Sequence, residues 1–203
     1  KRTLNTVILN LITTDNPTMD YDSVALYTSH SNSGTTALSL NGLDVAIRAM
    51  RDQAAYNEAS NILGERNLPK FLIVPNELEM RARRITNPSD AYAFGLDYPT
   101  GTGNLRPEQD ISIDPQAFKG MGIEVLVYDV MTDADDWFLV ANPAEVPTVV
   151  VGFWNGQQEP EIYVQDNALI GAVFSADKIT FKVRHIYGAD VLDHRSFYRQ
   201  VVT

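Results

Sequence analysis

The chain has 203 residues, with 26 acidic and 16 basic side chains and a net charge of −10. This length allows a sizeable core in one or two domains, and the acidic balance argues against a surface built to bind nucleic-acid phosphates. The absence of cysteine excludes disulfides, thiolate metal sites and a cysteine nucleophile. No apolar run approaches the ~20 residues that a membrane-spanning helix needs.

The first elements in chain order are two amphipathic helices. Apolar residues recur at helical spacing through residues 3–13, and Asn16-Pro17 predicts the end of that helix. A second helix is predicted from Leu43 to about Tyr56, with Ser39 or Asn41 as its cap. The polar residues 57–67 that follow predict a loop or a frayed extension of the helix.

The middle of the chain predicts a sheet. Residues 71–74 are wholly apolar, which predicts a central strand, and Asn76 is placed to cap a helix of residues 77–85. Residues 122–128 and 137–141 predict two further strands, paired across an acidic turn. We therefore expect an α+β fold in which helices cover a central sheet.

The last third of the chain predicts a long hairpin. The strand that begins at residue 148 is followed by Asn155-Gly156, a strong turn signal, and by a return strand at residues 161–165. In residues 178–185, apolar and polar side chains alternate. This pattern predicts a strand with one buried apolar face and one basic, solvated face.

Local patterns indicate no catalytic residue, no cofactor site and no metal site. The sequence has no P-loop, no Gly-x-Ser-x-Gly and no His-Glu-x-x-His. His30 stands alone beside a polar loop, which favours a structural role. Asp190 and His194 are four residues apart, but the residues around them predict a strand or turn rather than a shared helix face. The aspartates of residues 133–136 lack the Gly and Glu of a calcium loop.

Several sequence blocks carry a resemblance to a known family. Five segments in the last third of the chain resemble the C-terminal signature of tailed-phage major capsid proteins. They are residues 152–161, Gln165-Asp166, residues 182–185, Gly188-Ala189 and residues 195–198. Mu-like major head subunits and prohead protease–capsid fusions are the types that this signature resembles most. Residues 68–79 and 136–143 resemble two further blocks of the family, in the family's order, and residues 12–17 stand where its spine helix ends.

The resemblance implies the Hong Kong 97 capsid fold. It places residues 1–36 and 146–188 in a peripheral domain, with the end of the spine helix and a long hairpin. Residues 37–145 and 189–203 fall in an axial domain with the central sheet. The family's N-terminal arm and extended loop would be missing. We therefore expect the 203-residue chain to be a monomer or small ring, and a longer parent to form closed shells.

The function that the resemblance implies is structural. The chain would be a head protein of a tailed phage or prophage, assembled as pentamers and hexamers in the host bacterial cytoplasm into an icosahedral virion shell around the DNA. Its partners would be copies of itself, a scaffold or prohead protease and the portal, with no specific nucleic-acid site and no membrane.

Subunit contacts are expected at Trp154, Asn155 and Gly156 and in the loop from Tyr98 to Arg106, because exposed aromatic residues are common in interfaces. Three alternatives stay open. A monomeric binding module would show one concave aromatic face and no ring-forming edges. An encapsulin-like nanocompartment shell protein shares the fold, and a small hydrolase would need a deep pocket with convergent polar groups.

Overall fold

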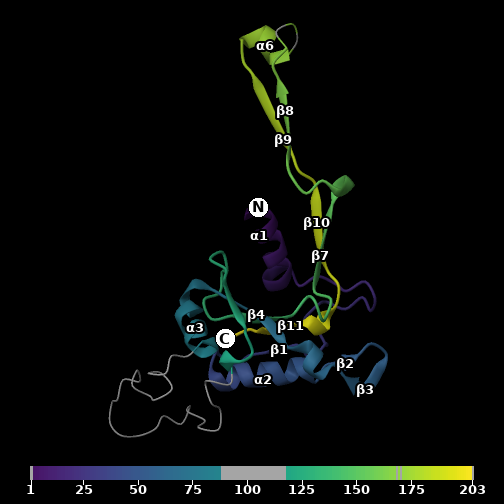
Figure 1. Cartoon of the computed structure of the whole chain (residues 1–203), viewed down its shortest axis with the longest axis vertical. Coiled ribbons are helices and arrows are strands. Elements are labelled where there is room, and N and C mark those ends of the chain that lie inside the picture. Colours follow the sequence, from purple (N-terminus) through teal and green to yellow (C-terminus); the bar gives the residue numbers. More distant parts are fainter. Residues whose placement is uncertain (1, 88–117, 168, 170, 203) are drawn as a thin grey trace, which may run out of the picture. The chain divides into compact units, whose positions relative to one another are not determined.

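The computed structural model describes residues 2–87, 118–167, 169 and 171–202 (Figure 1). The chain forms two compact units: residues 1–149 with 191–203, which include the central sheet, and residues 150–190. The fold is α+β, as the sequence predicts. No helix in the described part of the chain is long and apolar enough to cross a membrane.

The N-terminal helix is confirmed. α1 (Arg2–Asn10) continues into a π-helical stretch, η1 (Leu11–Asp15), and Asn16 ends it with a left-handed φ of 45°. The Asn16 side-chain oxygen accepts a hydrogen bond from the Tyr27 amide at 2.9 Å, and the Tyr27 hydroxyl donates to the carbonyl of Ile12 at 2.8 Å. These bonds attach the segment after the helix to the helix end.

A five-stranded mixed sheet forms the centre of the first unit. Its order is β1-β11-β6-β4-β5, with β1 parallel to β11, β4 parallel to β5, and antiparallel pairs on both sides of β6. The strands are β1 (Ser33–Gly34), β4 (Pro69–Val74), β5 (Glu124–Val127), β6 (Trp137–Ala141) and β11 (Phe197–Gln200). The predicted interior position of residues 71–74 is confirmed.

Alternate side chains of the sheet belong to two separate core layers. Leu139 packs in a layer with α2 (Leu40–Arg51) and α3 (Glu79–Thr86), the two helices predicted to cover the sheet. Its neighbour Phe138 points to the opposite face and packs in a layer with Ile12 and residues 19–27. All five residues of β6 are buried, so this strand is covered on both faces.

β5 and β6 follow one another in the chain but do not pair, so the predicted pairing across residues 132–136 is wrong. β4 lies between them, with Phe71 opposite Glu124 on one side and Leu72 opposite Leu139 on the other. Burial explains the order. β6 is apolar throughout and has neighbours on both edges, whereas β5 alternates between exposed and half-buried residues and forms the sheet edge.

The second helix is shorter than its sequence predicts. Ser39 caps α2 by accepting a hydrogen bond from the Gly42 amide at 3.0 Å, but the helix ends at Arg51 rather than near Tyr56. A small hairpin, β2 (Ala54–Ala55) and β3 (Glu58–Ile62), and a 3-10 turn, η2 (Gly64–Asn67), replace the predicted loop. The turn at Asn57 has a φ of 57°, which Asn tolerates better than most residues.

α3 begins later than predicted, and Asn76 does not cap it. Asn76 instead opens a 3-10 turn, η3 (Asn76–Leu78), directly after Pro75. α3 follows from Glu79, with no side-chain hydrogen bond at its cap residue, Leu78.

The second unit consists of two successive ribbons (Figure 1). β7 (Val149–Phe153) pairs with β10 (Tyr187–Val191), and β8 (Glu161–Gln165) pairs antiparallel with β9 (Thr180–Arg184). Between β8 and β9 the chain forms α6 (Gly171–Ala176), which lies at the end of the β8–β9 ribbon.

The predicted hairpin of β7 and β8, closed at Asn155-Gly156, is therefore wrong. Both residues have the positive φ that their types favour, 55° and 71°, but they lie in a 3-10 turn, η4 (Trp154–Gly156), that links the two ribbons. The partner of β8 is instead β9, whose alternating apolar residues match those of β8 across the ribbon.

Replacing Leu139 with Ala should lower the free energy of unfolding by about 2–5 kcal/mol, because the truncation leaves a cavity in a strand covered on both faces. The same replacement at Leu126 is the control. Leu126 is 40% exposed on the edge strand, so its loss should cost less than about 1 kcal/mol. Urea unfolding followed by circular dichroism measures both, and equal losses would contradict the interior position of β6.

Candidate functional site

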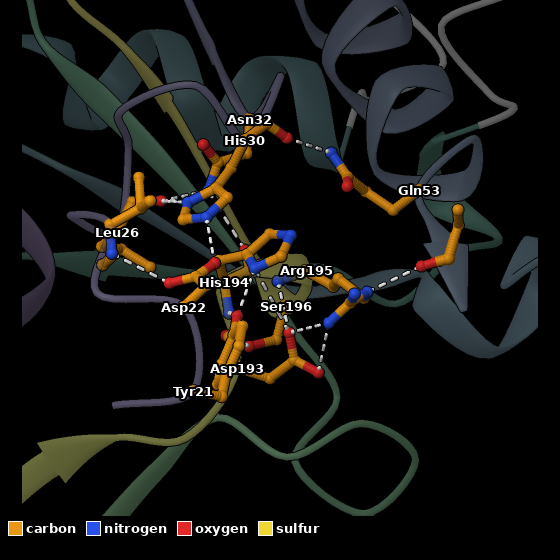
Figure 2. Close-up of polar contacts among 12 residues, drawn as sticks. Tyr21, Asp22, Leu26, His30, Asn32, Gln53, Asp193, His194, Arg195 and Ser196 are labelled. Carbon is orange, nitrogen blue, oxygen red and sulfur yellow. Dashed lines mark hydrogen bonds and ion pairs between the residues drawn. The ribbon is translucent and has the colours of Figure 1, made fainter. Parts of the chain in front are cut away.

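Two histidines that are far apart in the sequence meet in the first unit (Figure 2). His30 lies in the loop before β1, and His194 opens a 3-10 turn, η5 (His194–Ser196), just before β11. The side-chain amide of Asn32 joins the two segments by donating to the carbonyls of Leu26 at 2.9 Å and of His194 at 3.1 Å. Because Asn32 is fully buried, water does not compete for these bonds.

The imidazole rings of His30 and His194 are stacked, with centroids 3.8 Å apart and planes 6° from parallel. In His30, Nε2 lies 2.8 Å from Oδ2 of Asp22, and Nδ1 donates to the carbonyl of Leu26 at 3.1 Å. The Tyr21 hydroxyl forms a short hydrogen bond with Nδ1 of His194. Figure 2 shows these contacts together. We call Tyr21, Asp22, His30 and His194 the histidine cluster.

Burial sets the charge of His194. Loss of hydration, with smaller effects from His30 and Arg195, lowers the pKa of His194 to about 4. The ring is therefore neutral at pH 7. A hydrogen bond from the Val24 amide, aided by His30, lowers the pKa of the Asp22 carboxyl. At neutral pH the cluster thus contains a carboxylate beside a neutral imidazole.

Both ring nitrogens of His30 face oxygen acceptors. A neutral imidazole carries one N–H, and here Nδ1 donates it to Leu26. Nε2 and the Asp22 carboxylate, 2.8 Å apart, would then oppose two lone pairs. A proton on Nε2, donated to the carboxylate, accounts for this distance. Asp22, His30 and His194 each offer a ligand atom within 4.8 Å of the other two.

The serine and the aspartates near His194 do not form a nucleophile–base pair with it among the described residues. Ser196 is buried, but its hydroxyl donates to the carbonyl of Asp193 at 2.9 Å. The Asp193 carboxylate accepts from the Arg195 amide at 3.0 Å and binds the Arg195 guanidinium at 2.9 Å, while lying 3.8 Å from Nδ1 of His194. Asp190 belongs to β10 and shares no helix with His194. Nucleophilic catalysis needs a hydroxyl that faces its base.

The β8–β9 ribbon presents an apolar face to solvent. Its register places Ile162 opposite Val183 and Val164 opposite Phe181, so these four side chains share one face, which we call the ribbon face. Phe181 is 66% exposed and Val183 is 64% exposed. The prediction that this face is buried is wrong, because the two-stranded ribbon has no second layer over it among the described residues.

The other face of the ribbon is polar, as the alternation predicts. Arg184 pairs with Glu161 at 2.7 Å, and the ammonium of Lys182 lies 5.6 Å from the centre of the Tyr163 ring. These contacts are exposed and contribute little to stability.

The residues predicted to contact other subunits fall in two places. Trp154, Asn155 and Gly156 form η4, where Trp154 is 69% exposed and lines a cavity of about 60 Å³ with Arg184, His185 and neighbouring residues. Tyr98 and Arg106 lie outside the described residues. A role of these five residues in subunit contacts stays a prediction.

Local sequence patterns miss the histidine cluster. No ligand spacing links His30 to His194, since the fold alone brings the loop before β1 beside η5. The one usable signal is composition, because the sequence has only three histidines and two of them meet here.

Comparisons with known proteins give two findings. A family model described as "Phage capsid protein" matches residues 1–200. Among solved structures, a phage-related protein from Bordetella bronchiseptica RB50 is similar to this chain with a TM-score of 0.47 and 15% sequence identity, over 98% of this chain. The chain spans 66% of the length of that protein's chain. A search of curated proteins finds no match.

Acid should destabilise the folded chain through His194. Its pKa is about 4 in the folded state against the ordinary value of 6.5, so between these values the unfolded state binds more protons. The free energy of unfolding should fall as the pH drops from 6.5 to 4, by at most about 3 kcal/mol. Urea unfolding at several pH values, with a chelator present, measures this. His194→Gln should remove most of the effect, whereas His185→Gln should not; an unchanged slope in H194Q would contradict the assignment.

Proposed function

We propose that this chain is a major head subunit of a tailed phage or prophage, because it belongs to the phage capsid protein family, whose model matches residues 1–200. Its copies assemble as pentamers and hexamers into an icosahedral shell with the Hong Kong 97 fold, of the Mu-like type, around the DNA. Assembly takes place in the host bacterial cytoplasm, and the finished shell is part of the virion. Scaffold or prohead protease and portal are its further partners.

The observation that supports this proposal best is the exposed ribbon face. A two-stranded ribbon is at most marginally stable in water by itself, because it lacks a covering layer. Four large apolar side chains nevertheless point outward from β8 and β9. Exposed apolar surface of this kind marks contact sites. A subunit that is covered by its neighbours in a shell satisfies this requirement.

The domain assignment is part of the proposal. We assign residues 1–36 and 146–188 to a peripheral domain and residues 37–145 and 189–203 to an axial domain. The ribbons of residues 150–190 supply the long hairpin of the first. The sheet and its covering helices supply the core of the second. In the structure, residues 1–36 belong to the same compact unit as the sheet.

We propose no catalytic role for this chain, and the polar contacts of the first unit support its structure. The Ser196 hydroxyl and the Asp193 carboxylate form hydrogen bonds within η5 that support the turn. A hydrolase would be favoured by a serine or threonine hydroxyl that contacts the His194 ring. Among the described residues, the hydroxyl that contacts this ring is that of Tyr21.

Introducing a charge on the ribbon face should reduce self-association. Phe181→Lys places an ammonium where a neighbouring subunit would bury a phenyl ring, and burying an unpaired charge is costly. Thr180→Lys is the matched control, since it adds the same side chain at the adjacent residue, on the opposite face of β9. Sedimentation velocity at rising salt should show weaker association for F181K than for T180K and the unchanged chain.

The control measurements test the ribbon face as an interface separately from the proposed capsid function. Circular dichroism should show that both variants keep the fold, because both residues are exposed. Equal association of F181K and T180K would contradict the role of the ribbon face only. If the unchanged chain stays monomeric at every salt and protein concentration and forms no shells in negative-stain micrographs, the proposed assembly into a shell is wrong.

A further inference from the structure

We propose that the histidine cluster is a binding site for one divalent transition-metal ion, with Asp22, His30 and His194 as ligands and zinc as the representative ion. The site goes beyond the capsid function, since a shell subunit does not require a metal ion. It lies in the first unit, between the loop before β1 and the turn η5.

The donor set is the first argument. Two imidazoles and one carboxylate offer ligand atoms that lie within 4.8 Å of one another. Zinc takes three protein ligands of these types together with a fourth group, such as water. Imidazole nitrogen also suits copper, nickel and cobalt, whereas magnesium and calcium prefer sites built from oxygen alone.

The hydrogen bonds of His30 are the second argument. Nδ1 donates to the carbonyl of Leu26, which directs the lone pair of Nε2 at the Asp22 carboxylate, 2.8 Å away. Metal-binding histidines are commonly oriented in this way, by a backbone carbonyl on the second ring nitrogen. At zinc–ligand distances of about 2.0–2.2 Å, an ion cannot lie on the 2.8 Å line from Nε2 to the carboxylate, so it would replace the proton from a position beside that line.

Burial is the third argument. The side chains of His30 and His194 are almost fully buried, while that of Asp22 is partly exposed. The ligands are therefore shielded from water on one side and open to solvent at the carboxylate, which gives an ion a way in.

Binding requires one local movement. The two rings are stacked 3.8 Å apart with nearly parallel planes, and the lone pairs of an imidazole lie in its plane. One ring must therefore turn out of the stack so that its nitrogen points at Asp22. The ion would then connect the loop before β1 to the turn η5. The parallel pairing of β1 with β11 already holds these two segments near one another.

Zinc titration of tag-free, chelator-treated protein tests the site. Isothermal calorimetry should show one zinc ion bound per chain, and Co²⁺ should give the visible absorption of a nitrogen-coordinated site. His30→Gln, His194→Gln and Asp22→Asn should each weaken zinc binding at least tenfold. His185→Gln is the matched control: it removes the one histidine outside the cluster, and should bind zinc like the unchanged chain.

The variants also keep the test decisive if one of them fails to fold. Asp22 is partly exposed, so D22N should remain folded even if H194Q does not. Zinc should raise the unfolding temperature of the unchanged chain and of H185Q, but not of D22N. Zinc binding that is absent from the unchanged chain, or equal in D22N, H30Q and H185Q, would overturn the proposal and leave a proton as the only cation between His30 and Asp22.

Discussion

The complete burial of β6 is the constraint on which the rest of the first unit depends. A strand that is apolar on both faces needs cover above and below, and its backbone needs a partner on each edge. α2 and α3 cover one face, and the N-terminal segment covers the other. β4 and β11 occupy the edges. β11 must lie beside β6, so the turn η5, which directly precedes β11, lies next to the loop before β1. This position places His194 against His30.

Local patterns predict the elements well where one element determines its own burial. The apolar run at residues 71–74 indicates an interior strand whatever surrounds it, and the spacing of Leu43, Ile47 and Met50 fixes the buried side of α2. Local patterns fail where the pairing of a strand depends on a choice between several possible partner strands. Nothing local tells β6 to pair with β4 rather than with β5, since that choice depends on which strands are most apolar in the whole chain.

The same division applies to the sites. Alternation in residues 178–185 correctly identifies the side chains that share a face, but whether that face is covered depends on a layer outside the ribbon. His30 has an unremarkable local sequence, and its partners are assembled only by tertiary structure. The capsid family was indicated by ordered sequence blocks rather than by physical patterns, and the family match over residues 1–200 confirms a phage capsid protein.

The order of strands along the chain has a consequence for synthesis on the ribosome. β6 is translated well before β11, so its outer edge has free N–H and C=O groups until residues 197–200 emerge. A nascent chain thus carries a fully apolar open strand through the translation of roughly fifty residues. Pairing between distant segments is also slow to form. Ribosomes that follow one another closely on the same messenger would bring such open strands together, which favours pairing between chains before β11 is made.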